Sequence, residues 1–326
     1  MLGEFELIRR YLAPLAADEP AALGLIDDAA VLAAPPGRDL VLTADAMVAG
    51  VHYLAEDPPD LVARKLLRVN LSDLAAMGAT PRGYLLTACW PQDVEEHWIA
   101  QFVEGLAADQ AAFGIRLLGG DTTRTPGPAS LSLTALGTVP AGRCLRRSTA
   151  RAGDLVYVSG TIGDGALGLA ALQDRLAGLS AGARHFLAER YRLPQPRVAL
   201  GEALLAERLA TAALDVSDGL AADLAHIAET SGLAAQLEAA AVPLSPAARA
   251  ALKADPELLA SVLTGGDDYE LVFTVEPAQA EAVAALAGRL ALQLTRIGVM
   301  EAGEGVQVLD AAGVPMALGK SGWTHF

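Results

Sequence analysis

Length, composition and charge already exclude several classes of protein. The chain has 326 residues, more than one hydrophobic core usually holds, so we expect two domains. Hydrophobic residues make up 52% of the chain and charged residues 19%, which excludes an intrinsically disordered protein. The formal charge of −15 disfavours binding to DNA, RNA or an anionic membrane, because like charges repel.

Signals for export, membrane insertion and structural zinc are missing from the sequence. The two cysteines, Cys89 and Cys144, provide neither a disulfide framework nor a CxxC metal motif. The first residues lack a basic region followed by an apolar stretch, so we expect no signal peptide. No uncharged apolar run reaches the roughly 18 residues that suggest a membrane span. We therefore expect a cytoplasmic protein.

Helical and strand patterns alternate along the first half of the chain. The apolar spacing predicts helices over residues 4–17, 58–77 and 93–113, the last two ending at Gly78 and Gly114. Strands are predicted at 41–45, 84–90, 116–118 and 129–139. We interpret residues 142–153, rich in Gly and Arg, as a linker. The expected domains are therefore residues 1–150 and 151–326.

The second half shows the same mixture. Strands are predicted at 155–159, 212–216, 271–275 and 292–297, with an Ala-rich helix between the last two. Residues 160–165 form a strand-to-helix turn, residues 194–196 break a helical region, and residues 219–231 form a helix. Both halves combine strands with helices, so the fold class is α/β or α+β.

Five short segments that contain aspartate indicate the function of the chain. They are residues 27–28 (DD), 43–45 (TAD), 70–73 (NLSD), 119–123 (GGDTT) and 215–219 (DVSDG). One aspartate at the end of a strand commonly forms a turn or caps a helix, so the joint pattern matters more than any member. Carboxylates shared with phosphate oxygens are the usual ligands of Mg²⁺. We expect these side chains to converge on one pocket that binds metal ions and phosphate.

Several other enzyme classes are excluded by their missing motifs. The chain has no GxxxxGK[ST] motif, and none of its three lysines follows a Gly-rich loop, so it is not a P-loop protein. It lacks the HRD and DFG motifs of protein kinases. Its five histidines do not have the spacing of zinc ligands. A basic run, Arg143, Arg146, Arg147 and Arg151, is either an exposed linker or a clamp on a polyphosphate, which Arg124 could join.

Taken together, these segments resemble the thiamine-monophosphate kinases, a family within the superfamily typified by aminoimidazole ribonucleotide synthetase. The similarity runs nearly from end to end of the chain. It covers residues 3–8 (GEFELI), 27–30 (DDAA), 43–45 (TAD), 50–52 (GVH), 70–79 (NLSDLAAMGA), 119–123 (GGDTT), 158–164 (VSGTIGD), 215–220 (DVSDGL), 265–270 (GGDDYE) and 322–326 (GWTHF). The sequence departs from the family pattern at Ile26, Ala44 and Asp267.

The resemblance implies a two-domain fold with mixed sheets flanked by helices, and a homodimer formed through the N-terminal domains. It implies ATP-dependent phosphorylation of thiamine monophosphate to the diphosphate, with several Mg²⁺ ions. It also implies roles for individual residues. The implied metal ligands are Asp28, Thr43, Ala44 (through its carbonyl), Asp45, Asp73, Asp121, Asp215 and Asp218; the ATP contacts are Gly120, Asp121, Arg147 and Ser217; the substrate contacts are His52, Asp267 and Trp323.

The chemistry of that reaction requires no general base. The acceptor is a phosphate oxygen that is already ionised at neutral pH, so positioning and charge neutralisation should supply most of the rate. Three alternatives stay open at this point. They are another ATP-dependent enzyme of the superfamily, a metal-dependent phosphohydrolase, and a nucleotide-binding protein without activity.

Overall fold

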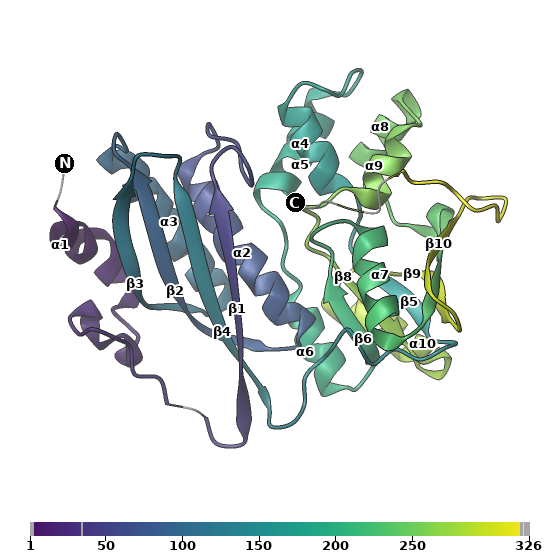
Figure 1. Ribbon diagram of the computed structural model, residues 1–326, viewed down its shortest axis with the longest axis horizontal. Helices are drawn as coiled ribbons and strands as arrows, with labels where there is room; N and C mark the ends of the chain where they lie inside the picture. Colours follow the sequence, from purple (N-terminus) through teal and green to yellow (C-terminus); the bar gives the residue numbers. More distant parts are fainter. Residues whose placement is uncertain (1–2, 34, 320–321, 323–326) are drawn as a thin grey trace. The chain divides into compact units, whose positions relative to one another are not determined.

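The computed structural model describes residues 3–33, 35–319 and 322, and its chain divides into two compact units (Figure 1). Unit 1 comprises Met1–Leu74 and Ala79–Arg143. Unit 2 comprises Ala75–Gly78 and Cys144–Phe326. Both units mix strands and helices, which confirms the predicted fold class.

Unit 1 is built on a four-stranded sheet with the order β1 (Arg38–Val48), β4 (Ser130–Pro140), β2 (Thr80–Pro91) and β3 (Arg116–Thr125). The β1–β4 and β4–β2 pairs are antiparallel, whereas β2 and β3 are parallel. Parallel neighbours need a crossover connection, and α3 (Glu96–Phe113) supplies it. Figure 1 shows α3 and α2 (Pro59–Ala76) on one face of this sheet.

The two faces of the unit 1 sheet differ in burial. Leu131, Leu133 and Tyr84 are at most 1% exposed, whereas Leu42 and Leu85 on the other face are 61% and 39% exposed. Strand side chains alternate between faces, so this contrast follows from the sequence pattern. The helices bury one face, and within unit 1 the other face stays open.

The N-terminal segment follows a helical path whose hydrogen-bonding pattern changes repeatedly. It begins with α1 (Glu4–Leu7) and continues through the π-helical η1 (Ile8–Leu12) and the 3₁₀ turn η2 (Ala13–Ala16). A second 3₁₀ segment, η3 (Pro20–Leu25), packs beside β3. The predicted helix over residues 4–17 is therefore helical but not a regular α-helix. Pro14 contributes to this because its nitrogen has no hydrogen to donate.

The strands predicted at 41–45 and 84–90 are longer in the structure, as β1 and β2, and two further boundaries in unit 1 are wrong. The strand expected at 116–118 runs on to Thr125, so residues 119–121 (GGD) lie inside β3 rather than after it. Gly120 permits this because a Cβ there would lie 1.8 Å from the Leu86 carbonyl oxygen. The helix expected to start near residue 93 begins at Glu96, because a turn closed by the Val94 nitrogen and the Pro91 oxygen precedes it.

Unit 2 contains a six-stranded sheet with the order β10-β7-β9-β5-β8-β6. The strands are β5 (Leu155–Ser159), β6 (Ala210–Asp215), β7 (Ala234–Glu238), β8 (Leu271–Val275), β9 (Leu294–Glu301) and β10 (Gly305–Leu309). The helices are α4 (Asp164–Leu172), α5 (Ala181–Arg192), α6 (Val198–Ala206), α7 (Leu220–Ser231), α8 (Pro246–Ala254), α9 (Leu258–Thr264) and α10 (Ala280–Leu290), with short 3₁₀ turns η4 (Ala239–Ala241) and η5 (Pro277–Gln279).

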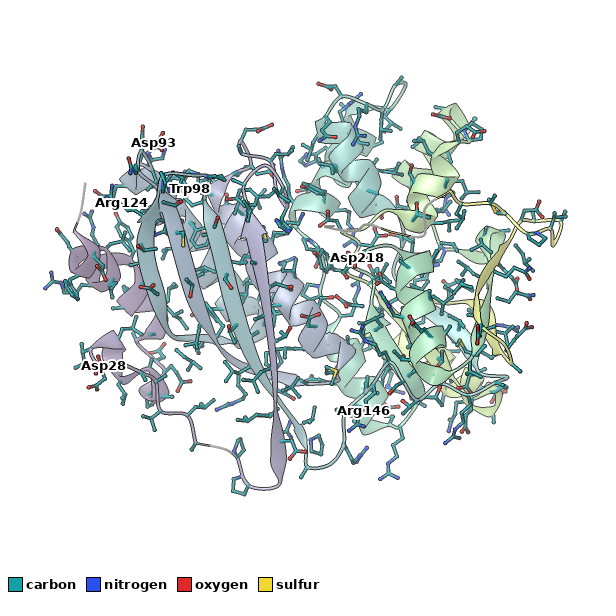
Figure 2. The ribbon with its side chains drawn as sticks, in the orientation of Figure 1. Asp28, Asp93, Trp98, Arg124, Arg146 and Asp218 are labelled. Atoms are coloured by element: carbon teal, nitrogen blue, oxygen red, sulfur yellow. The ribbon has the colours of Figure 1, made fainter. Side chains whose placement is uncertain are left out.

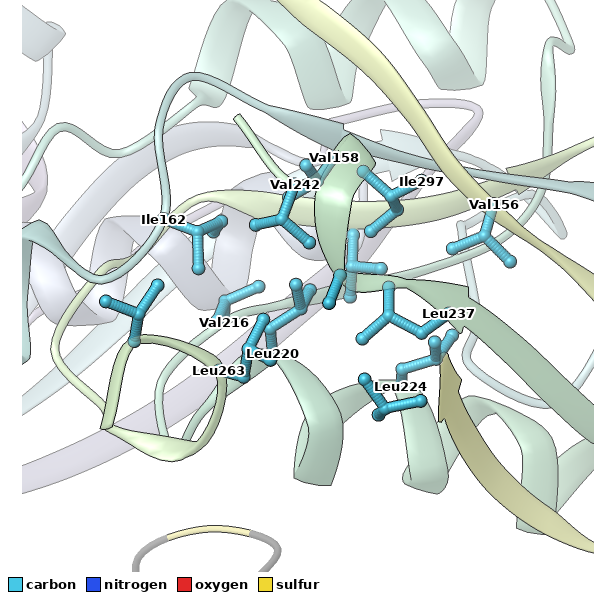
Figure 3. Packing of buried hydrophobic residues seen from close by; sticks show 14 of the residues in the cluster. Val156, Val158, Ile162, Val216, Leu220, Leu224, Leu237, Val242, Leu263 and Ile297 are labelled. Atoms are coloured by element: carbon cyan, nitrogen blue, oxygen red, sulfur yellow. The ribbon is translucent and has the colours of Figure 1, made fainter. Parts of the chain in front are cut away.

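The core of unit 2 lies between α7 and the sheet (Figure 3). Leu220 and Leu224 of α7 pack with Val158, Leu237 and Ile297 from three strands, and all five are fully buried. Each fully buried side chain of this kind contributes about 1.5–3 kcal/mol relative to an exposed one. The core thereby holds the N-terminal end of α7, and the loop before it, in place.

The predicted strands at 155–159, 212–216 and 271–275 and the helix at 219–231 are confirmed within one or two residues. We did not predict β7, β10, α8 or α9. A signal for α8 was present, because Ser245 precedes Pro246 and its hydroxyl accepts a hydrogen bond from the Ala248 nitrogen at 3.0 Å. Over the described ranges, no helix combines the length and the apolar character needed to cross a membrane.

Candidate active site

The first group of predicted site residues lies where β1 faces α2. The Thr43 hydroxyl donates a hydrogen bond to Asp73, and the side-chain Oδ1 of Asn70 accepts one from the Asp45 nitrogen at 3.2 Å. Asn70 also donates to the Leu66 carbonyl at 2.9 Å, which fixes its orientation. Asn70 and Asp73 are three residues apart on α2 and both contact β1, so they share one face of the helix. Hydroxyl, carboxylate and amide oxygens in one place are suitable ligands for a hard cation.

Asp121 belongs to a different part of unit 1. It is exposed on β3 and aligns across the sheet with Thr87, Ser132 and Ala46, so it shares their face. Asp45 is the chain neighbour of Ala46 and aligns with the buried Leu133, so it belongs to the opposite face.

The sheet order also separates these two carboxylates along the sheet. Strands β4 and β2 lie between β1 and β3. Neighbouring strands are about 4.8 Å apart, so β1 and β3 are about 14 Å apart. Carboxylate ligands approach Mg²⁺ to about 2.1 Å. Asp45 and Asp121 of one chain therefore cannot bind the same ion.

Asp28 lies on the side of unit 1 that carries β3. It is exposed and follows η3, which packs beside β3. Figure 2 shows Asp28 and Arg124 at opposite ends of this side of the unit. In the part of the chain that the structure describes, no three His, Cys, Asp or Glu side chains form a metal-binding group. The expected convergence of all the carboxylates on one pocket is thus not found within unit 1.

His52 is held just beyond the end of β1. Its Nδ1 accepts a hydrogen bond from the Val48 nitrogen at 3.0 Å, so the proton of a neutral ring is on Nε2. Its carbonyl oxygen accepts a hydrogen bond from Lys65 Nζ at 3.1 Å, and Lys65 is 3% exposed. These contacts fix the imidazole next to the strand that carries Thr43 and Asp45.

Unit 2 brings its predicted site residues together. The segment 215–219 lies beside the segment 266–270, because the Val216 nitrogen donates to the Glu270 carbonyl at 2.8 Å and the Tyr269 nitrogen donates to the Val216 carbonyl at 2.8 Å. The Asp267 nitrogen donates to the Ser217 carbonyl at 2.9 Å. Asp215, Ser217 and Asp218, predicted for metal and ATP, therefore adjoin Asp267, predicted for substrate.

The backbone of the second segment is strained. Asp267 has φ of 70° and Tyr269 has φ of 51°, both in the left-handed region that residues other than glycine rarely adopt. Each such residue costs on the order of 1–3 kcal/mol and persists only where its surroundings enforce it. Strain of this kind is concentrated at functional sites.

Two buried carboxylates enforce this conformation. Asp268 accepts hydrogen bonds from the backbone nitrogens of Gly163 at 2.6 Å and Gly165 at 2.9 Å. Glu270 accepts from Arg197 Nε and Ser159 Oγ, both at 2.6 Å, and from Arg190 Nη2 at 2.9 Å. Both acids are at most 1% exposed. They hold the intervening Tyr269 and the preceding Asp267 at the surface of unit 2.

Comparison with known proteins places this arrangement in a family. The models for the N-terminal and C-terminal domains of AIR synthase related proteins match residues 26–139 and 151–311. The thiamine-monophosphate kinase of Caulobacter vibrioides is 47% identical over 325 residues, which cover 99% of this chain and 90% of that protein. That of Escherichia coli K12 is 42% identical over 99% of this chain and 98% of that protein. This chain belongs to the thiamine-monophosphate kinase family.

Solved structures agree with this assignment. The thiamine-monophosphate kinase of Stenotrophomonas maltophilia K279a superposes with a TM-score of 0.85 at 45% identity, covering 94% of this chain and 96% of that one. A complex of AaThiL with AMPPCP and TMP superposes with a TM-score of 0.79 at 29% identity, covering 100% of this chain and 97% of that one. The expected two-domain fold of the thiamine-monophosphate kinase family is therefore confirmed.

A further acid supports the loop before α7 but was missed in the sequence. Asp223 is 3% exposed, and its carboxylate accepts hydrogen bonds from the Asp218 and Gly219 nitrogens, both at 3.1 Å. Burial, and then the negative charge of Asp218, raise the pKa of Asp223 to about 7, against the lowering effect of the backbone N–H groups. Aspartates in the first turns of helices are common, so sequence alone did not distinguish Asp223.

The arginines of the basic run have different contacts. Arg151 donates to Glu276 at 2.5 Å, so its charge is already paired. Arg146 and Arg147 are exposed, and the Arg147 carbonyl accepts hydrogen bonds from Thr230 and Ser231 at 3.1 and 3.2 Å. These bonds anchor the Arg147 backbone, and its role as an ATP contact stays a prediction. Trp323, the remaining predicted substrate contact, lies outside the described residues.

Proposed function

We propose that this chain transfers the γ-phosphoryl group of ATP to the phosphate of thiamine monophosphate. The observation that supports it most directly is the hydrogen-bonded pair of segments 215–219 and 266–270, which joins Ser217 and Asp218 to Asp267. Family membership adds support, as does the relative that binds AMPPCP and TMP. We also propose that the enzyme acts in the cytoplasm.

The residues of the chain have defined tasks in this reaction. Asp223 fixes the turn before α7, so Ser217 and Asp218 are held at the N-terminal end of that helix (Figure 2 labels Asp218). The positive end of a helix dipole favours phosphate at this position. The strained segment presents Asp267 beside them. Two reacting phosphates are thereby oriented by one rigid pair of loops.

The oxygen ligands of unit 1 suit magnesium. Thr43, Asp45 and Asp73 offer a hydroxyl and two carboxylates, the donor set that a hard cation prefers, and Asn70 and Thr43 hold the acids through hydrogen bonds. When bound, Mg²⁺ would neutralise phosphate charge and reduce the repulsion between the two substrates. An ionised acceptor phosphate needs no base, so we propose direct in-line transfer without a phosphoenzyme.

One assay tests the proposed reaction. The purified protein, incubated with ATP, Mg²⁺ and thiamine monophosphate, should form thiamine diphosphate, detected by chromatography. Asp73→Asn should lose nearly all turnover with an unchanged circular dichroism spectrum. Phosphate release that is independent of thiamine monophosphate would instead indicate a phosphohydrolase. A radiolabelled protein trapped from γ-labelled ATP would contradict direct transfer.

We further propose a homodimer in which unit 1 of each chain completes the site of the other. The predicted ligands of unit 1 divide into a group at β1 and α2, with Thr43, Asp45 and Asp73, and a group on the β3 side, with Asp28 and Asp121. A single chain does not join the groups, whereas a second copy could bring its β3 edge to the β1 edge of the first. The open apolar face that carries Leu42 and Leu85 supports burial against such a copy.

Mixing two inactive variants tests this sharing. Asp45→Asn and Asp121→Asn should each abolish turnover alone. Mixed after unfolding and refolding, they should form heterodimers in which one site has both aspartates, giving about one quarter of wild-type activity with random assortment. No recovery, with heterodimers present by native mass spectrometry, would show that each site is built by one chain.

A further inference from the structure

The motif at residues 158–164 (VSGTIGD) has no role in the function proposed so far. It runs from the end of β5 into α4 within unit 2, and none of its side chains is a predicted ligand. We call residues 159–165 the glycine turn. Ser159 is fully buried, and residues 162–165 are buried as well. Buried residues do not meet a substrate directly, so any part that this turn has in the reaction must act through its neighbours.

Two glycines of this turn pack directly against residues 265–270, which we call the acceptor loop because Asp267 is the predicted substrate contact. A Cβ at Gly165 would lie 2.4 Å from the Asp267 carbonyl oxygen. A Cβ at Gly160 would lie 2.2 Å from Oε1 of Glu270. Heavy atoms in contact are about 3.5–4.0 Å apart, so neither position has space for a side chain. The backbone of the glycine turn therefore forms the surface on which the acceptor loop packs.

The same turn supplies hydrogen-bond donors to the acceptor loop. The Gly163 and Gly165 nitrogens donate to different oxygens of Asp268, at 2.6 and 2.9 Å. The Ser159 hydroxyl donates to Glu270 at 2.6 Å. Charged acceptors form stronger hydrogen bonds than neutral ones, so these contacts hold the loop firmly. The acceptor loop is thus bound to the glycine turn at both of its buried acids.

A different support holds the ATP loop (residues 215–219), which carries the predicted ATP contact Ser217. Asp223 of α7 accepts hydrogen bonds from the Asp218 and Gly219 nitrogens of this loop, both at 3.1 Å. The glycine turn supports the acceptor loop from β5 and α4. Because the two supports belong to different elements, we expect a change in one of them to displace mainly its own loop.

We propose that the glycine turn is a positioning element that sets the affinity for thiamine monophosphate, whereas Asp223 separately sets the affinity for the nucleotide. The proposal rests on the proposed function, because it takes Asp267 as a contact of the acceptor and Ser217 as a contact of ATP. The two reacting phosphates must be held in line, and a displacement of about 1 Å can lower a rate about 100-fold. The motif at residues 158–164 thereby acquires the task of holding one of the two reactants.

A methyl group at residue 165 tests the role of the glycine turn. The nearest neighbours of that methyl are backbone atoms of the acceptor loop, so Gly165→Ala should move Asp267 by about 1 Å. Calorimetric titration with Mg²⁺ present should show binding of thiamine monophosphate weakened at least tenfold and binding of ADP changed less than threefold. Gly298→Ala is the matched control, because its Cβ would lie 2.0 Å from the Gln236 carbonyl oxygen, between β9 and β7. It should lower the melting temperature but bind both ligands normally.

The ATP loop should show the opposite selectivity. Asp223→Ala removes the bonds to the Asp218 and Gly219 nitrogens, so ADP binding should weaken at least tenfold and thiamine monophosphate binding less than threefold. One oxygen of Asp223 accepts both bonds, and Asp223→Asn keeps such an oxygen. Asp223→Asn should therefore bind ADP within threefold of the wild type. A merely structural role of either support would lower the melting temperature without this selectivity.

Ser159→Ala covers the case in which Gly165→Ala does not fold. It removes one hydrogen bond to Glu270, so thiamine monophosphate binding should weaken at least threefold with ADP binding unchanged. Normal binding of thiamine monophosphate by the variant that folds, or equal weakening of both ligands, would overturn the proposal. Failure of the wild-type protein to bind thiamine monophosphate would instead refute the proposed function, and this positioning role with it. Because the wild type is titrated first, the two failures are distinguishable.

Discussion

The two units position their predicted site residues in contrasting ways. In unit 2, Ser217, Asp218 and Asp267 come together within one chain, and the buried acids Asp268 and Glu270 fix the loop that carries Asp267. In unit 1, Asp45 and Asp121 lie at opposite edges and on opposite faces of one sheet. The predicted site aspartates thus lie on adjoining, prearranged loops in unit 2, whereas in unit 1 they form two separated groups.

The difference shows that aspartates of one chain need not share a site merely because they recur at strand ends. Buried acids in unit 2 act on the backbone, through N–H groups and arginines, and leave the exposed acids to meet ligands. Unit 1 also has a buried acid, Asp109, but it pairs with Arg64 and Arg68, whereas the site residue Asp45 is supported at its nitrogen by the Asn70 side chain. The site loop of unit 2 should therefore depend on its buried acids, whereas the site residues of unit 1 should depend more on assembly.

The largest effect on folding is expected for Glu270→Gln. The change removes a charge that is fully buried and leaves Arg190 and Arg197, which are 12% and 20% exposed, without their shared partner. Breaking a buried ion pair in this way costs about 3–5 kcal/mol. Urea unfolding followed by circular dichroism measures the loss.

The matched control for that change is Glu276→Gln. Glu276 pairs with Arg151 at the surface, where the side chains are 47% and 70% exposed. An exposed pair contributes about 0–1 kcal/mol, so the control should unfold almost as the wild type does. Equal losses in the two variants would remove the distinction between the buried network and the surface of unit 2.

A pH-dependent stability is expected from Asp268. Burial raises the pKa of Asp268 to about 8, although the N–H groups of Gly165 and Gly163 lower it. The folded protein then holds a proton that the unfolded chain has already released, so stability falls as pH rises toward this pKa. Between about pH 6 and about pH 9 the loss should be about 2–3 kcal/mol.

Urea unfolding at several pH values checks this dependence. Asp268→Asn removes the titration, so its free energy of unfolding should vary less with pH over that interval. Asp174→Asn changes an aspartate whose side chain is 93% exposed and should retain the wild-type slope. An unchanged slope in Asp268→Asn would assign the pH dependence to another group.

Local features of the fold could be predicted from the sequence. Gly78 and Gly114 follow helices at φ of 71° and 66°, as glycines at helix ends do. Helical periodicity located α2 and α7, and a short, nearly continuous apolar run located β8, which is buried along its whole length. Likewise, the shared face of Asn70 and Asp73 follows from helical spacing alone.

Non-local features could not be predicted in this way. Strand order decides that Asp45 and Asp121 are at opposite edges, and no local pattern encodes that order. The burial of Asp268 and Glu270 was missed, because acids are mostly exposed and their partners are about 70–110 residues away in the chain. The strand was predicted to end at residue 118, but it continues through Gly119 and Gly120, where Gly120 closely approaches the Leu86 backbone of β2.

A smaller loss is expected for Asn70→Ala in unit 1. Asn70 is fully buried, and the change removes its bonds to the Asp45 nitrogen and the Leu66 carbonyl. Leaving buried polar groups without partners costs about 1–3 kcal/mol. Urea unfolding measures this cost. The free energy of unfolding of Asn70→Ala is compared with that of Ser72→Ala, which changes a buried serine on the same helix. An Asn70→Ala protein as stable as the wild type would show that unit 1 does not depend on this support.

The smallest effect on the folding of one chain is expected for Leu42→Lys. Leu42 is 61% exposed on the open face of the unit 1 sheet, so the change should alter the free energy of unfolding of one chain by about 0.5 kcal/mol or less. In the proposed homodimer, however, one lysine from each chain would enter a buried apolar interface. The dissociation constant of the dimer should therefore increase at least tenfold. Analytical ultracentrifugation measures the dissociation, with Val314→Lys in unit 2 as the control. An unchanged dissociation constant would mean that the open face lies outside the contact between copies, and unit 1 would then need another way to join its two groups of ligands.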